Sequence, residues 1–493
     1  MAIQMRYGTL ETSLTALVVA LLPILGCATN PATGGRQLML VSQEQEAQLG
    51  RQQDEQILAS GQVYEDPGLQ DYVQQLGSSL AAKSERPELP WTFRVLDDEI
   101  VNAFAAPGGY IYVTRGILAH LNSEAELATV LGHEIGHVTA RHSANQISKQ
   151  QLMGMGLVVG MVLEPAVAAW SDVAQAGLGL AALKFSRDDE RQADSLGLRY
   201  MVGAGYDPYQ APEVFDMLNR VTRASGAGGM PSWASTHPQP ENRTQLIEGR
   251  LAEIEPLPSN LTVESRGYLQ RLDGVIFGHD PREGFFEDEL FLHPGLGFRI
   301  EFPRDWKTHN AKDLVAGVSP QQDAAVVLSL AKEETPLRAA EEFVWSEGVQ
   351  GERPRTGTVN GLQSAWTRFE VETGRNGEKL AGRALFVLHR DLVFRIVGYT
   401  PRSRWSGYSN QVEAAMQTFS EETDSRVLNM QPARLRLIEV GSRMSLSEAC
   451  QRHGSSLSVE EVALLNDLQT NSILAKGDLV KIVTGGPTKD SRR

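Results

Sequence analysis

The chain has 493 residues, of which 41% are hydrophobic and 22% are charged, and it carries a formal net charge of −15. This length predicts about two to four folded domains, and the negative charge excludes a nucleic-acid-binding protein because no basic surface offsets it. The chain has only two cysteines, Cys27 and Cys450, which excludes a disulfide framework.

The N-terminus has the pattern of an export signal. Residues 14–25 (LTALVVALLPIL) form an apolar core that is too short to span a bilayer comfortably. The next residues complete ILGC at 24–27, which resembles a bacterial lipobox. Residues 1–27 are therefore expected to be a signal peptide with lipid attached to Cys27, and the alternative is a plain secretory signal with a chance cysteine. Ala28 favours, by the same resemblance, the outer membrane and a periplasmic location.

The next segment alternates between helical and strand patterns. Capping boxes predict helix starts at Ser42 and Ser123, since Gln or Glu follows three residues later. A further helix is predicted over 69–82, a strand over 91–96, and a hairpin with a glycine turn over 101–114. This small sheet either is purely structural or offers an edge that binds an extended peptide by strand addition.

The stretch VLGHEIGHVTARH lies within a helix predicted over 123–150. Residues four apart share a helix face, so His133 and His137 can converge on one cation, and two neutral imidazoles suit zinc. Glu134 can act beside them as a general base toward water. Gly136 costs about 1 kcal/mol in a helix interior, which predicts that something else, such as close packing, favours glycine there.

A catalytic zinc ion normally has three protein ligands, so a third is expected from another helix. The helix predicted over 184–205 places Glu190 and Asp194 on one face. Glu190 could bind the metal while Asp194 orients a ligand histidine. The alternative is that this carboxylate pair belongs to a solvated helix surface.

These motifs, in this order, resemble the HtpX / CAAX-prenyl-protease family of zinc metallopeptidases, and more narrowly its BepA- and LoiP-like branch of periplasmic lipoproteins. The HEIGH motif and the downstream Glu-x-x-x-Asp carry the resemblance. It extends over roughly residues 30–255 through NPATGGRQLMLVSQEQE at 30–46, NAFAAPGGYIYVTRGIL at 102–118 and STHPQPENR at 235–243. The resemblance implies a mainly helical zincin (gluzincin) domain with a small β-sheet.

The resemblance also implies roles for individual residues. One zinc ion per chain would be bound by His133, His137 and Glu190, with Glu134 as the catalytic base and Asp194 supporting the site.

Residues outside these two helices have implied roles as well. His237 and Arg243 would lie near the active site and stabilise the transition state, or His237 would occupy the open zinc position and restrain activity. Taken alone, His237 fits an ordinary loop histidine before a proline better than a site residue. His120 and His142 match no metal role and are expected to be structural. The edge expected to bind the substrate backbone comprises Asn102, Ala103, Phe104 and Ala105.

The whole chain is predicted to be an α+β multidomain protein, with the metallopeptidase domain at 28–255. The apolar run at 152–163 is too short to span a membrane and is expected to be a buried helix or a mobile flap. Four C-terminal segments are predicted: a linker at 256–285, an α+β accessory domain at 286–423 that resembles the PsbP/Mog1-like sandwich, a unit at 434–484 that resembles a LysM module, and a disordered tail at 485–493.

We therefore expect a zinc-dependent endopeptidase of the bacterial cell envelope that degrades misfolded or unassembled envelope proteins. The alternative is a non-catalytic chaperone or assembly-factor lipoprotein that binds outer-membrane clients. Glu134 favours the peptidase, because a pure binder has no need of a base beside the metal ligands. The expected partners are polypeptides, the membrane through a lipid anchor only, and peptidoglycan or an envelope protein through the C-terminal module.

Overall fold

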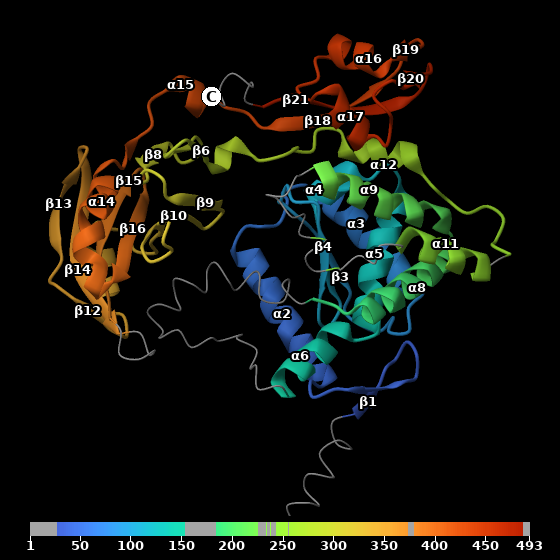
Figure 1. Cartoon of the computed structure of the whole chain (residues 1–493), viewed down its shortest axis with the longest axis horizontal. Coiled ribbons are helices and arrows are strands. Elements are labelled where there is room, and N and C mark those ends of the chain that lie inside the picture. The colour runs from blue at the N-terminus through green and yellow to red at the C-terminus, as the bar shows by residue number, and fades with distance from the viewer. Residues whose placement is uncertain are drawn as a thin grey trace, which may run out of the picture.

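The computed structural model describes residues 27–152, 184–224, 233, 237, 243–254, 256–372 and 379–486. The predicted signal peptide before Cys27, the apolar run after Leu152 and residues 487–493 of the predicted tail lie outside this part. Helices dominate the N-terminal half of the chain and strands dominate the segment that follows (Figure 1). The described protein is α+β and multidomain, as the sequence predicted.

The N-terminal half is mainly helical around a small sheet. The sheet has the order β3-β5-β4, with β5 parallel to β3 and antiparallel to β4. Gly108 and Gly109 form the predicted glycine turn of the β4–β5 hairpin with φ of 84° and 105°, values that favour glycine. The elements are β1 (Cys27–Thr29), β2 (Arg36–Leu38), α2 (Gln43–Ala59), α3 (Pro67–Ala81), β3 (Thr92–Leu96), β4 (Ala103–Ala106), β5 (Tyr110–Thr114), α4 (Arg115–His120), α5 (Glu124–Thr139), α6 (His142–Leu152), α8 (Arg187–Ala204), η1 (Pro208–Gln210), α9 (Ala211–Ala224) and α11 (Arg243–Ile254).

The two predicted capping boxes differ in the structure. At α2, the Ser42 hydroxyl accepts the Gln45 N–H and the Gln45 side chain accepts the Ser42 N–H, so this box is confirmed. At α5, Ser123 accepts the Glu126 N–H at 3.1 Å. The Glu126 carboxylate, however, accepts the N–H of Asn122 at 2.8 Å, so the second box is only half formed.

The single helix predicted over 123–150 is wrong, because the chain breaks between α5 and α6. Arg141 lies at the break with φ of 60°. Its buried guanidinium donates to the Glu46 carboxylate at 2.8 Å and to the Val41 carbonyl at 2.9 Å. Because an unpaired buried charge would cost several kcal/mol, these contacts outweigh the local preference for a continuous helix.

Helices α5 and α8 approach each other closely where both carry glycine. A Cβ atom on Gly136 would lie 2.9 Å from the Ala193 carbonyl oxygen, and one on Gly197 would lie 2.9 Å from the His133 nitrogen. Such distances are shorter than real Cβ contacts, so only glycine permits this approach. The close packing predicted at Gly136 is confirmed, and it sets the carboxylates of α8 against the histidines of α5.

The segment after the helical half folds into two sheets and two long helices. The eight-stranded sheet has the order β12-β14-β15-β16-β11-β10-β9 with β13 paired to β14, and a four-stranded sheet has the order β17-β8-β7-β6. Helices α13 and α14 contribute to separate apolar clusters of the large sheet. The elements are η2 (Pro281–Glu283), β6 (Phe285–Glu287), β7 (Leu290–His293), β8 (Phe298–Glu301), β9 (Lys307–Ala311), β10 (Leu314–Val318), β11 (Ala325–Leu330), α13 (Pro336–Trp345), β12 (Val349–Gly351), β13 (Arg355–Val359), β14 (Leu362–Glu372), β15 (Lys379–His389), β16 (Leu392–Pro401), η3 (Arg402–Arg404), α14 (Trp405–Gln417), β17 (Ser420–Glu421) and α15 (Ser425–Leu428).

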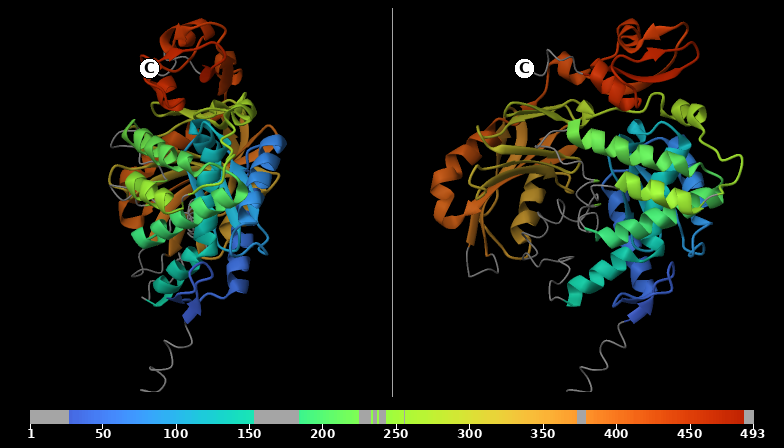
Figure 2. Two further views of the ribbon diagram at one scale, coloured as in Figure 1. Left: turned by 90° about the vertical axis from the view of Figure 1, so that its right-hand side faces the viewer. Right: turned by 45° about the vertical axis from the view of Figure 1, so that its right-hand side comes forward.

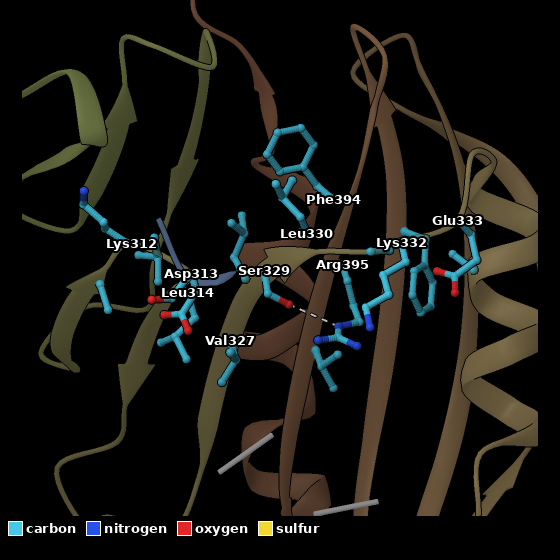
Figure 3. Close-up of a pocket in the computed structure, with 18 of the residues that line it drawn as sticks. Lys312, Asp313, Leu314, Val327, Ser329, Leu330, Lys332, Glu333, Phe394 and Arg395 are labelled. Carbon is cyan, nitrogen blue, oxygen red and sulfur yellow. Dashed lines mark hydrogen bonds between the residues drawn. The ribbon is translucent and has the colours of Figure 1, made fainter. Parts of the chain in front are cut away.

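A cavity of about 1180 Å³ lies between α2 and the large sheet. Ile57 of α2 lines one side, and Leu314, Val327 and Arg395 line the other. Figure 3 shows Arg395 in this wall, where its Nε donates to the Ser329 hydroxyl at 3.1 Å. The sequence did not predict this cavity, because its walls come from segments far apart in the chain.

The C-terminal module follows the strand–helix–helix–strand order predicted for 434–484. β18 pairs antiparallel with β21, and Cys450 is a buried free thiol. The likeness to a LysM module stays a prediction. The elements are β18 (Ala433–Glu439), β19 (Met444–Ser445), α16 (Leu446–His453), α17 (Val459–Leu465), β20 (Ile473–Leu474) and β21 (Leu479–Gly485).

Residues 256–285, predicted to be a linker, pack against the helical half. Helix α12 (Ser265–Leu272) buries Tyr268, whose hydroxyl donates to the Leu118 carbonyl at 2.8 Å. Residues 274–277 also exchange backbone hydrogen bonds with the start of β18. The sequence pattern did not reveal this pairing, because it depends on residues more than 150 positions away.

A buried lysine joins the C-terminal module to the helical half. Lys481 on β21 is 1% exposed, and its Nζ donates to the carbonyls of Ala119 and Leu121, both at 2.7 Å. The C-terminal module and β1 lie at opposite ends of the molecule (Figure 2). Among the helices of the described residues, none combines the length and apolar character that crossing a bilayer requires.

Candidate active site

The predicted metal ligands come together between α5 and α8. The Nε2 atoms of His133 and His137 lie 3.0 Å apart, and each lies 3.5 Å from an oxygen of the Glu190 carboxylate. His237 completes the cluster, with its Nδ1 3.3 Å from the His133 Nε2 and 3.0 Å from Glu190. All four side chains are buried, and their potential ligand atoms lie within 4.8 Å of one another.

The chemistry of this cluster fits a zinc ion. The Nδ1 of His133 faces a carboxylate oxygen of Asp194 at 2.9 Å, so it carries the proton and leaves the Nε2 lone pair directed at the cluster. Two imidazole nitrogens and one carboxylate oxygen form a ligand set that zinc prefers. The Oε2 of Glu190 is buried and has no hydrogen-bond partner among the described residues, although it forms an ion pair with the Arg243 guanidinium. A cation at the centre of the cluster would satisfy these facing lone pairs.

Glu134 occupies the position expected of a general base. Neither of its carboxylate oxygens has a hydrogen-bond partner among the described residues, although the side chain is fully buried. His237 is the neighbouring imidazole, with its Nε2 3.6 Å from the Glu134 Oε1. Burial raises the pKa of Glu134 to about 8, so this carboxylate binds a proton readily. A buried, unpaired carboxylate is costly for stability, which is typical of a functional group.

Asp194 and Arg243 hold the ligand side chains His133 and Glu190 in position. The Arg243 guanidinium donates to the two oxygens of Asp194 at 2.6 and 3.1 Å, and its Nη1 lies 3.2 Å from the Glu190 Oε2. Burial alone would raise the pKa of Asp194, but the charge of Arg243 and the hydrogen bond with His133 outweigh burial and hold it at about 2. Asp194 is therefore ionised and keeps His133 oriented.

Aromatic rings enclose the histidines. Trp233 stacks on His237 with ring centroids 4.2 Å apart and an angle of 20° between the planes. Phe185 packs against His137 with ring centroids 4.0 Å apart. These apolar rings lower the local polarity and strengthen the electrostatic interactions inside the cluster.

The sequence did not predict one contact of the ligand His137. The Nδ1 of His142 lies 2.9 Å from the Nδ1 of His137, whereas His142 was expected to be only structural. The break at Arg141 allows this contact, and no helical periodicity predicts it. The Nδ1 of His120, the other histidine expected to be structural, contacts the Gly116 carbonyl at 2.8 Å.

The predicted substrate edge is the outer strand of the small sheet. β4 pairs only with β5 within the described sheet, so its other edge is not covered by a strand. Asn102 precedes β4, and its buried side-chain oxygen has no hydrogen-bond partner among the described residues. Phe104 stacks on Tyr112 with ring centroids 4.9 Å apart, and Ala103 and Ala105 are buried. Binding of a substrate at this edge stays a prediction, as does the attachment of lipid to Cys27.

An HExxH helix set beside a helix that supplies a ligand glutamate defines the metallopeptidase class of site. Comparison with known families agrees: residues 67–251 match the model described as Peptidase family M48. This segment contains every predicted metal ligand and the predicted base. The resemblance to a metallopeptidase family is confirmed over this part of the chain.

Individual relatives point the same way. The mitochondrial metalloendopeptidase OMA1 of Arabidopsis thaliana is 37% identical over 186 residues, which cover 38% of this chain and 37% of that protein. The beta-barrel assembly-enhancing protease of Yersinia pestis is 30% identical over 238 residues, which cover 46% of this chain and 48% of that protein. The matched segments thus span less than half of each relative.

One solved structure is that of a PsbP protein. The solution structure of PsbP from Synechocystis sp. PCC 6803 aligns with 28% of this chain and 94% of its own, at 14% identity and a TM-score of 0.23. Because this TM-score is low, the PsbP/Mog1-like fold stays a prediction.

Proposed function

We propose that this protein is a zinc endopeptidase of the bacterial cell envelope. Its substrates would be misfolded or unassembled envelope polypeptides, and lipid at Cys27 would hold it at the outer membrane, facing the periplasm. Glu134 carries the proposal, since a buried carboxylate without a hydrogen-bond partner lies beside two imidazoles whose lone pairs converge. A protein that only bound its clients would gain nothing from this costly arrangement.

The side chains divide the chemistry among them. His133, His137 and Glu190 would hold zinc, which when bound polarises a peptide carbonyl and makes water more acidic. Glu134 would take a proton from the attacking water and return it to the departing amine. Asp194 keeps the Nδ1 proton of His133 in place, and no covalent link between enzyme and substrate is needed.

His237 would restrain this activity in the conformation described. Its Nδ1 lies close enough to His133 and Glu190 to serve as a fourth ligand, in the place that a catalytic zinc site normally keeps open. Stacking on Trp233 would stabilise this closed arrangement. Cleavage would then require His237 to move away from the cluster.

The proposed envelope location and substrates are supported by two observations outside the site. The lipobox-like ILGC at 24–27 supports export, and the name of the Yersinia relative, a beta-barrel assembly-enhancing protease, supports a role in the assembly of beta-barrel proteins. The accessory domain would bind clients or regulate the peptidase. The C-terminal module would dock on peptidoglycan or an envelope protein.

Casein cleavage tests the proposal. The wild type loaded with zinc should cleave casein, and Glu134→Gln should abolish cleavage while it keeps the fold and the bound zinc. Equal cleavage by both proteins would refute the assigned base. His137→Ala should lose zinc, whereas His453→Ala, an exposed histidine on α16, should retain it. Zinc binding without any cleavage, both in the wild type and in His237→Ala, would favour the non-catalytic chaperone instead.

A further inference from the structure

A chain of hydrogen bonds leads from the N-terminal turn to the metal ligand His137. It passes from Asn30 to Gln192 and His142, and no catalytic or binding role has so far been given to any of these three residues. Asn30 lies between β1 and β2 and is 5% exposed, and Gln192 lies on α8 two residues after Glu190. The order of donors and acceptors along the chain can be deduced from one end.

The deduction begins at a backbone amide, whose role as donor is certain. The N–H of Ala32 donates to the Asn30 Oδ1 at 2.9 Å, so the other end of the Asn30 amide is the NH₂ group. This Nδ2 lies 3.3 Å from the side chain of Gln192, whose facing atom must accept and is therefore Oε1. The Asn30 side chain thus sets the orientation of the Gln192 amide.

The same Gln192 oxygen determines the tautomer of His142. The Nε2 of His142 lies 2.8 Å from it and must donate, so the Nδ1 of the neutral imidazole carries no proton. That Nδ1 lies 2.9 Å from the Nδ1 of His137, which in turn must donate. The Nε2 of His137 is then left with a lone pair, and this atom faces His133 and Glu190.

We propose that Asn30, Gln192 and His142 are positioning residues that hold His137 in the tautomer and ring orientation required of a metal ligand. The proposal rests on the proposed zinc site. His142 would accept the Nδ1 proton of His137, just as Asp194 accepts the Nδ1 proton of His133. The acceptor is a neutral imidazole for His137 and a carboxylate for His133. The proposal also gives the NPATG stretch at 30–34 a purpose, since its turn presents the Asn30 amide to α8.

The two ligand histidines are consequently held in different ways. His133 donates to a charged carboxylate, which strengthens its basicity. His137 donates to the uncharged imidazole of His142. Whether the facing nitrogen of His142 accepts or donates depends on the Asn30 amide, about 110 residues earlier in the sequence. Replacing the Asn30 amide with a group that only accepts hydrogen bonds should therefore weaken zinc binding, although Asn30 forms no hydrogen bond with a metal ligand among the described residues.

Zinc affinity of the full chain, measured by competition with a chromogenic chelator, tests the proposal. The measurement uses Glu134→Gln as the parent so that self-cleavage cannot interfere. His142→Leu and Asn30→Asp should each weaken zinc binding about 10- to 100-fold. Asn30→Asp presents an acceptor to Gln192, which would turn its amide and reverse every donor along the chain.

The matched control is Asn145→Asp. Asn145 is also buried, and its Nδ2 donates to the backbone carbonyl of Leu38 near the N-terminal turn at 2.7 Å, but it forms no hydrogen bond with Gln192 or His142 among the described residues. It should leave zinc affinity unchanged. Nitrogen chemical shifts of the zinc-free protein supply a second reading, since His137 should carry its proton on Nδ1 in the parent and lose that preference in Asn30→Asp.

The outcomes separate the two proposals. Zinc affinities of His142→Leu and Asn30→Asp within twofold of the parent, with His137 still protonated on Nδ1, would overturn the positioning role while the metal site stands. A parent that binds no zinc would overturn the proposed function itself. An equal loss in Asn145→Asp would show that general destabilisation, and not the hydrogen-bond chain, controls the affinity.

Discussion

Substitution of Gly136 by alanine should separate the two helices that build the site. The new Cβ atom would lie 2.9 Å from the Ala193 carbonyl oxygen and 3.0 Å from its Cα, whereas ordinary contact begins near 3.4 Å. Both neighbours are backbone atoms and cannot rotate away. Helix α8 must therefore shift by about 0.5 Å, and Glu190 and Asp194 move with it.

The energetic effect has two opposing parts. Overpacking of a helix contact costs about 1–3 kcal/mol, while alanine in place of glycine in a helix recovers about 1 kcal/mol. The free energy of unfolding should fall by about 1 kcal/mol. Zinc affinity should fall by about tenfold, because the carboxylate of Glu190 is displaced from His133 and His137.

Two measurements on Gly136→Ala check this reasoning: thermal unfolding of the zinc-free protein and zinc competition with a chelator. Gly249→Ala on α11 is the matched control, since its Cβ would meet nothing within 4 Å. This control should gain up to about 1 kcal/mol and keep its zinc affinity. If Gly136→Ala is as stable as the control and binds zinc like the wild type, the close approach does not set the geometry of the ligands.

Three further predictions concern buried polar groups. Because the pKa of Glu134 is raised, the folded zinc-free protein holds a proton between pH 4.5 and about 8 that the unfolded chain has lost. The free energy of unfolding should therefore fall by roughly 5 kcal/mol at most as the pH rises through this window, and Glu134→Gln should remove the accompanying fall in Tm. His237→Ala should increase casein cleavage several-fold with zinc retained, and a decrease would show that His237 assists catalysis. Lys481→Met leaves the carbonyls of Ala119 and Leu121 without a donor, at about 1–3 kcal/mol each, so limited proteolysis should release the C-terminal module at a lower temperature than in the wild type.

Local sequence patterns predicted the parts of the site that depend on helix periodicity. The spacing of His133, Glu134 and His137 on one helix predicted their roles in the site. Gly136 indicated close packing, because glycine is otherwise unfavourable in a helix interior. Assigning Glu190 depended on the resemblance to a family, since no spacing rule joins two helices that are separated in the chain.

Features that depend on distant partners were missed. Arg141 breaks the predicted helix because its guanidinium is paired with Glu46, about 95 residues earlier, and no residue near the break signals this. His142 enters the site only as a result of that break. The packing of the supposed linker has the same origin, since the partners of residues 274–277 lie at the start of β18.

The placement of β1 and the C-terminal module at opposite ends of the molecule determines how far from a membrane the module would lie. Lipid at Cys27, the first residue of β1, would set the near end of the protein against the bilayer. The C-terminal module would then be held at the far end, away from the membrane surface, and Lys481 would keep it there as a fixed extension. Such a molecule would span part of the space between a membrane and whatever layer faces it, with its peptidase centre suspended between the two.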